Sequence, residues 1–100
     1  MNSLVETYHG YDVHIFSFGY VIKKCGYSMI FSIERQGKRI FGLPCFISAL
    51  GFLEEVKPAE VEQNAEKILL KKGLQRIHER IDSGQFFTEG ETYEEYQVDH

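Results

Sequence analysis

Two cysteines and four histidines are the side chains of this 100-residue sequence with the widest chemistry. They are His9, His14, Cys25, Cys45, His78 and His100. None falls in a C-x-x-C or H-x-x-x-H pattern, the spacings that offer two ligands to one metal ion. His9 and His14 are five residues apart, which places them on opposite faces of a strand. The spacing therefore predicts no metal site and no cofactor.

Cys45 is the candidate nucleophile, because it follows a predicted strand and precedes a predicted short helix, where a thiolate is favoured. His14 or His78 would then serve as its base. Cys45 also lies in the most apolar segment of the chain, which favours a buried, inert thiol. Cys25 follows two lysines and precedes a glycine, so it is predicted to be the more reactive thiol. We interpret the chain as a protein that is not an enzyme, with no catalytic residue.

The charge of the chain argues against general binding to nucleic-acid phosphates. The net charge is −4, and residues 54–100 hold twelve of the fifteen acidic side chains. Nucleic-acid affinity depends on Lys and Arg that neutralise phosphates, so an acidic chain is a poor general binder. The first ten residues lack the basic start and apolar middle of a signal peptide, and no apolar run is long enough to cross a bilayer. These features predict a cytoplasmic protein without membrane contact.

Period-two alternation predicts strands over 11–18, extendable to 22, then 27–35 and 38–43. Gln36 and Gly37 lie between the second and third of these strands, where Gly tolerates the positive φ of a tight hairpin turn. Pro44 is expected to end the third strand, because it removes a ladder donor. Ser48 is expected to cap a short helix reaching Glu55.

A long helical signal covers 58–82, with Pro58 suited to the first turn and Gly84 to the stop. Its apolar residues form two stripes on nearly opposite sides. The first is Val61, Ala65, Ile68 and Leu69, and the second is Leu70, Leu74, Ile77 and Ile81. Either the helix breaks at Gly73, or one helix carries two apolar faces. A glycine inside a helix costs about 1 kcal/mol relative to alanine, which favours the break.

These elements predict an α+β fold. A small, mostly antiparallel sheet over 11–43 is followed by a helical layer over 46–82 that packs on one of its faces. Residues 1–87 form a single domain in this interpretation, and residues 88–100 form an acidic tail. Alternation over 92–98 permits an edge strand, whereas the run of carboxylates equally suits a frayed end.

The order of elements resembles a family of small bacterial proteins catalogued as a domain of unknown function. The resemblance covers roughly 30–87 and implies an α+β fold, without implying an activity. It is carried by Gly37, Cys45, Ile47, Ser48, Ala49, Leu50, Ile77, Ile81, Gly84 and Phe86.

The two-sided helix and the apolar residues on both sheet faces exceed what one helical layer covers, and surplus apolar surface indicates a contact site. We therefore predict a protein-interaction or regulatory module that forms a homodimer or binds another protein. The predicted contact residues are Leu70, Leu74, Ile77 and Ile81. The alternative is RNA or single-stranded nucleic-acid binding, with Tyr20, Tyr27 and Phe31 stacking on bases. The basic strip for that alternative is Lys71, Lys72, Arg76 and Arg80.

Overall fold

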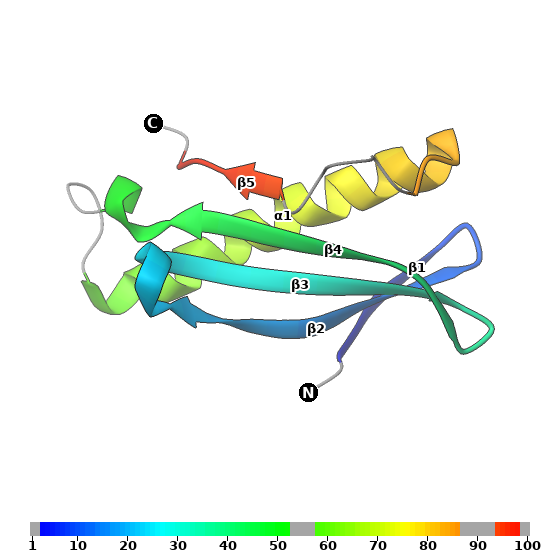
Figure 1. Ribbon diagram of the computed structural model, residues 1–100, viewed down its shortest axis with the longest axis horizontal. Coiled ribbons are helices and arrows are strands. Elements are labelled where there is room, and N and C mark those ends of the chain that lie inside the picture. The colour runs from blue at the N-terminus through cyan, green and yellow to red at the C-terminus, as the bar shows by residue number, and fades with distance from the viewer. Residues whose placement is uncertain (1–2, 53–57, 87–93, 99–100) are drawn as a thin grey trace.

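The computed structural model describes residues 3–52, 58–86 and 94–98. Four strands come first, then one helix and a short last strand: β1 (Ser3–Tyr8), β2 (Tyr11–Val21), β3 (Gly26–Arg35), β4 (Lys38–Ser48), α1 (Pro58–Ser83) and β5 (Glu94–Tyr96). Short 3-10 helices, Ile22–Lys24 and Ala49–Phe52, follow β2 and β4. The strands lie in sequence order in one sheet, in which β5 is parallel to β4 and all other pairs are antiparallel (Figure 1).

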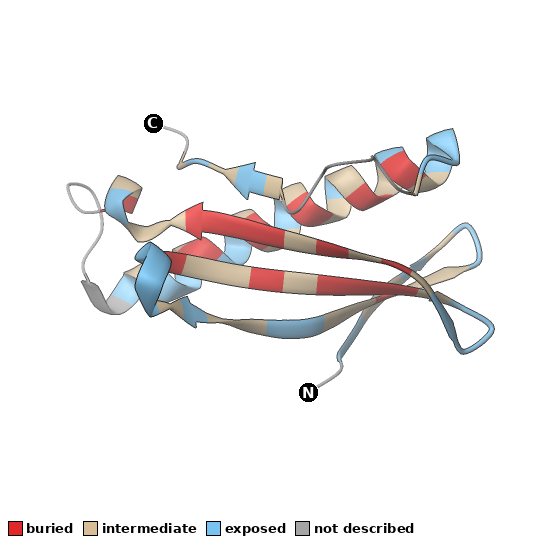
Figure 2. Ribbon diagram, viewed as in Figure 1, coloured by how far each residue is buried: buried red, intermediate tan, exposed pale blue. Residues whose placement is uncertain are grey.

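Helix α1 packs on one face of this sheet, which confirms the predicted α+β fold. Alternate residues of β3 turn Met29, Phe31 and Ile33 toward the helix, and all three are fully buried. Neighbouring strands supply the rest of the core, which consists of Val13, Phe41, Leu43, Cys45, Ile47, Phe52, Ala65, Leu69 and Ile77. Figure 2 shows the buried segments of β3, β4 and α1 facing one another.

The hairpin at Gln36 and Gly37 is confirmed. Their φ angles are 53° and 79°, so both central residues are left-handed, as a tight antiparallel turn with the right twist requires. His9 and Gly10 repeat this geometry between β1 and β2, with φ angles of 48° and 83°.

The predicted break at Gly73 is wrong, because α1 runs unbroken from Pro58 to Ser83. Gly73 is buried where the helix passes over Phe31. A Cβ at Gly73 would lie only 2.3 Å from Cε2 of the Phe31 ring. The glycine therefore permits a close approach of helix backbone to sheet, a different use from ending a helix.

The two apolar stripes are the two ends of a single row of buried positions that winds around the helix axis. The fully buried or closely packed positions are Ala65, Leu69, Gly73 and Ile77, each four residues after the last. Four residues turn a helix by 400°, so every step moves the row about 40° around the axis. Such a row can follow a twisted sheet. Because its middle position is a glycine, the sequence shows two separate apolar sets.

Several strand boundaries differ from the sequence prediction. Strand β4 continues through Pro44 to Ser48, and the predicted helix from Ser48 is a 3-10 turn as far as Phe52, with 53–57 outside the described residues. The pairing of β5 with β4 begins at Cys45, so Pro44 lies beside that ladder and not within it. Residues 3–8, which the sequence left without an element, form β1, and part of the acidic tail forms β5.

Strand β1 is fastened to the C-terminal end of α1 by polar contacts. The Tyr8 ring stacks on His78 with 3.9 Å between ring centroids, and its hydroxyl donates to the Asp82 carboxylate at 2.8 and 2.9 Å. The carboxylate of Glu6 contacts the ring of His78 as well. These contacts explain how a strand with little apolar alternation joins the sheet.

Replacing Gly73 by alanine tests the helix–sheet approach. Helix propensity alone predicts that Gly73→Ala stabilises the protein by about 1 kcal/mol. We expect the reverse, a loss of about 1–3 kcal/mol, because the new methyl group overlaps the buried Phe31 ring. Urea unfolding followed by circular dichroism measures the change, with exposed Gln63→Ala as the control. A more stable Gly73→Ala protein would contradict the close approach.

Candidate interaction surfaces

The structure turns the predicted contact residues of the helix toward its own sheet. Ile77 is fully buried in the core, so its assignment to a partner surface is wrong. Leu70, Leu74 and Ile81 are partly buried and pack against the same core. The apolar surface available to a partner must therefore be sought elsewhere.

The sheet face opposite α1 is shielded by its own long side chains. The guanidinium of Arg39 lies across Gly42, where a Cβ would come within 2.0 Å of Nη2. The Lys24 ammonium lies 5.6 Å from the centroid of the Phe46 ring, which is only 7% exposed. Charged side chains with long aliphatic stems thus cover apolar surface on this face. His14 Nε2 and Glu34 Oε2 add a polar contact there at 3.1 Å.

The C-terminal half of β2 is a free edge. Strand β1 pairs with β2 only from Tyr11 to Ile15, and no strand of the described residues lies beside positions 16–21 (Figure 1). The backbone along such an edge presents unpaired N–H and C=O groups that accept another strand. We call residues 16–21 the β2 edge.

The β2 edge and its flank carry most of the large exposed apolar side chains that the structure describes. Phe16 is 52% exposed, Tyr20 is 51% exposed, and Ile22, just beyond the edge, is 81% exposed. The stretch 13–22 contains no Lys, Arg, Asp or Glu. Natural proteins usually protect an exposed edge with charges, prolines or bulges, and of these the β2 edge has only the irregularity between Ile15 and Ser17. Strand β4 does so outside its pairing with β5, since Lys38, Arg39 and Pro44 lie there.

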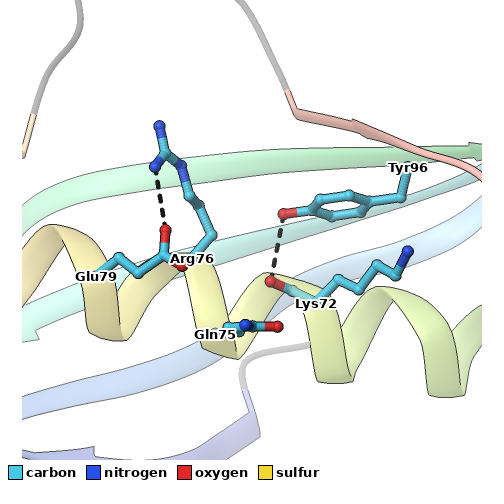
Figure 3. Close-up of a pocket in the computed structure, with 5 residues that line it drawn as sticks. All are labelled: Lys72, Gln75, Arg76, Glu79 and Tyr96. Atoms are coloured by element: carbon cyan, nitrogen blue, oxygen red, sulfur yellow. Dashed lines mark hydrogen bonds and ion pairs between the residues drawn. The ribbon is translucent and has the colours of Figure 1, made fainter.

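A groove of about 330 Å³ lies between α1 and β5. Lys72, Gln75, Arg76 and Glu79 reach it from the helix and Tyr96 from the strand, as Figure 3 shows. Arg76 pairs with Glu79 at 3.2 Å, and the Tyr96 hydroxyl donates to the Lys72 carbonyl at 3.4 Å. The groove is therefore lined by cationic, carboxylate and aromatic groups from two elements that lie far apart in the sequence.

The basic strip of the nucleic-acid alternative is only partly at the surface. Lys71 is exposed, whereas Lys72 and Arg76 are half-buried. The side chain of Arg80 is 7% exposed and bonds the Phe86 carbonyl at 2.9 Å. Arg76 and Arg80 both contact Glu94 Oε1, at 2.9 and 3.3 Å.

The aromatic residues of that alternative are also divided. Tyr20 is exposed and Tyr27 is half-buried, but Phe31 is fully enclosed in the core. Its predicted role in stacking on bases is therefore wrong, because Phe31 lies beneath α1.

The two thiols lie in different environments. Cys45 is 1% exposed, and burial raises the pKa of its thiol to about 12. A thiol that stays protonated is a poor nucleophile. Cys25 is exposed and adopts a left-handed backbone conformation with φ of 50° at the end of the 3-10 turn. Within the described ranges, no three His, Cys, Asp or Glu side chains come together as metal ligands.

No protein-family model matches the chain, and neither curated proteins nor solved structures give a significant match. The resemblance to a small bacterial family therefore stays a prediction. The described part of the chain contains no helix with the length and apolar character needed to cross a membrane.

The sequence contains signals for both surfaces, one of which, the alternation over 92–98, is among the alternatives given above. The charge-free stretch that includes Phe16 and Tyr20 indicated an unprotected edge. The alternation of Glu94, Tyr96 and Val98 indicates a strand that packs with one of its faces. The arginines at positions 76 and 80, four residues apart on a helix, are possible partners for the carboxylate of Glu94.

Introducing a charge at Ile77 distinguishes a core position from a contact position. We expect Ile77→Glu to unfold the chain, because the new carboxylate would be buried without a partner. Exposed Gln75→Glu, two residues away, adds the same charge and should leave the fold intact. Thermal unfolding by circular dichroism distinguishes the two. A folded, soluble Ile77→Glu protein would show that this residue lies at the surface.

Thiol titration tests the contrast between the cysteines. At pH 8, a thiol with a pKa of about 12 is thiolate in only about one molecule in ten thousand, so Cys45 should react only after denaturation. The exposed Cys25 should account for the single native reaction with a chromogenic disulfide. Cys25→Ser should abolish this reaction and Cys45→Ser should preserve it. Rapid modification of Cys45 in the folded protein would refute its enclosure.

Proposed function

We propose that this protein is a non-catalytic interaction module that self-associates through the β2 edge. The observation that carries the proposal is an unpaired strand segment with exposed aromatic side chains and no Lys, Arg, Asp or Glu, in a sheet whose unpaired part of β4 carries Lys38, Arg39 and Pro44. Strand addition at such an edge is an established mode of protein recognition.

A second copy is the partner that this edge fits best. Antiparallel pairing of two β2 edges about a two-fold axis near Phe18 brings the exposed aromatic side chains of both copies to one seam, with Tyr20 beside Tyr27 and Phe16 at the irregularity between Ile15 and Ser17. The symmetry supplies every contact across the seam twice. Because the β2 edge, residues 16–21, contains no Lys, Arg, His, Asp or Glu, no like charges oppose each other across the axis.

The proposal replaces the helix surface predicted from the sequence, but it retains the prediction of a homodimer. Nucleic-acid binding has less support, because Arg76 and Arg80 of the basic strip already pair with Glu94 in the same chain. The buried, protonated thiol of Cys45 likewise favours a binding role over a catalytic one.

Two lysines on the β2 edge should separate the copies. We expect the wild-type protein to show the mass of a dimer by light scattering at high concentration. Phe16→Lys with Tyr20→Lys removes both aromatic side chains from the seam and adds two cations to it in each copy, so the dissociation constant should rise at least tenfold, by roughly 1.4 kcal/mol or more.

The matched control is Leu50→Lys, which alters an apolar side chain of similar exposure in the 3-10 turn after β4. This variant should remain a dimer, and circular dichroism should show all three proteins folded. A monomeric mass for the wild type at every concentration, or a dimer that tolerates both lysines, would remove the β2 edge as the contact.

A further inference from the structure

We propose that the edge of β4 together with the adjoining side of α1 is a recognition site for an extended acidic peptide of a partner protein, and that β5 occupies this site within the chain. The peptide class is Glu-x-Tyr-x-Val, the pattern of Glu94, Tyr96 and Val98. This site is separate from the β2 edge, at the opposite side of the sheet.

The backbone of the site is a strand edge that β5 covers for three residues. Cys45, Phe46 and Ile47 pair in parallel register with Glu94, Glu95 and Tyr96. Main-chain pairing of this kind binds any extended peptide, and pockets for alternate side chains supply the specificity. Glu95 and Gln97 are exposed, whereas the residues between and beside them are half-buried. Specificity must therefore lie with Glu94, Tyr96 and Val98.

The first pocket is built for a carboxylate. Glu94 Oε1 accepts from Arg76 Nε at 2.9 Å and from Arg80 Nη2 at 3.3 Å. With β5 in place the side chain of Arg80 is 93% enclosed, and its Nη1 donates to the Phe86 carbonyl at 2.9 Å, a contact that does not involve β5. Charge-assisted bonds to a fixed, partly buried guanidinium are stronger and more selective than exposed ion pairs.

The second and third pockets accept an aromatic ring and a small apolar side chain. The Tyr96 hydroxyl reaches the Lys72 carbonyl, and the Lys72 ammonium lies 5.9 Å from the Tyr96 ring centroid. Val98 packs where Gly51 has no side chain, since a Cβ at Gly51 would lie 2.9 Å from Val98 Cγ2. The third pocket thus depends on a glycine in the 3-10 turn after β4.

Because β5 occupies the site within the chain, an external peptide must displace β5 in order to bind. A tethered segment competes at an effective concentration in the millimolar range, so an external peptide binds only weakly while β5 is in place. Weakening β5 within the chain must therefore increase the apparent affinity for the same peptide added from outside. A partner with the same pattern would gain access by displacing the acidic tail.

The test uses the full chain and a fluorescent synthetic peptide with the sequence of residues 92–100. Fluorescence anisotropy should show the peptide binding Glu94→Gln protein at least about tenfold more tightly than wild type, because the internal strand has lost its charge-assisted bonds. Glu95→Gln is the matched control, since it removes the same charge from an exposed position of the same strand and should bind as wild type does. A peptide carrying the Glu94→Gln change should bind Glu94→Gln protein at least about tenfold more weakly than the unmodified peptide.

Equal peptide affinity for the Glu94→Gln and Glu95→Gln proteins, or no binding to either, would overturn the proposal. The measurement is repeated with Phe16→Lys and Tyr20→Lys in the same chain, where binding should be unchanged. Peptide binding therefore stands or fails independently of dimerisation at the β2 edge. A dimer that persists in that background, and that the free peptide dissociates, would assign the site to the tail of a second copy and overturn its assignment to a partner protein.

Discussion

The contact of the α1 backbone with the Phe31 ring is the constraint on which the rest of the structure depends. Because Gly73 brings the axis of a 26-residue helix close to the middle of the sheet, one helix can cover the face that Met29, Phe31 and Ile33 present. The row from Ala65 to Ile77 then winds with the sheet, and both apolar stripes are used within one chain. A larger side chain at position 73 would lift the helix and open the core on both sides.

The coverage of one sheet face by a single helix also determines which apolar surfaces stay exposed. One helix covers one face, so the opposite face must be made compatible with water by other means. Arg39 over Gly42 and Lys24 over Phe46 do this with side-chain stems and charged ends. The surplus of apolar surface inferred from the sequence is therefore not spread over the sheet. It is concentrated at the β2 edge, since the described part of β1 pairs with β2 only as far as Ile15.

Local patterns were enough to predict much of this fold. Alternation located β2 and β3, and the Gln36-Gly37 turn located the hairpin, because side-chain period and positive φ are properties of neighbouring residues. Pro44 and Gly73 misled for related reasons. A proline ends a strand only where a neighbouring strand needs the N–H that it lacks, and a glycine ends a helix only where no packing contact offsets its low helix propensity. At Pro44 the pairing with β5 had not begun, and at Gly73 the sheet required the space.

The strands β1 and β5 and the two candidate surfaces depend on residues distant in sequence. Strand β1 is held by Tyr8 on His78 and Asp82, contacts that span about seventy positions and leave no local period. The acidic tail was correctly seen as rich in carboxylates, but its partners, Arg76 and Arg80, had been assigned to a nucleic-acid surface. Charges of opposite sign in separate segments can be solvated or paired, and only the fold distinguishes the two.

The edges of the sheet differ in how far they are protected against strand addition, and this difference affects how copies could assemble. A sheet with two compatible free edges adds copies head to tail without limit and forms filaments. Here β4 carries Lys38, Arg39 and Pro44 along part of its edge and β5 along the rest, while β1 is tied to the helix. Each of these features opposes strand addition. Under the proposed self-association, the β2 edge is the self-complementary surface among the described strands, and a single such surface closes at two copies. Protection of the other edges and exposure of this one are therefore parts of the same arrangement, since an aromatic edge is compatible with a soluble sheet only if its assembly terminates.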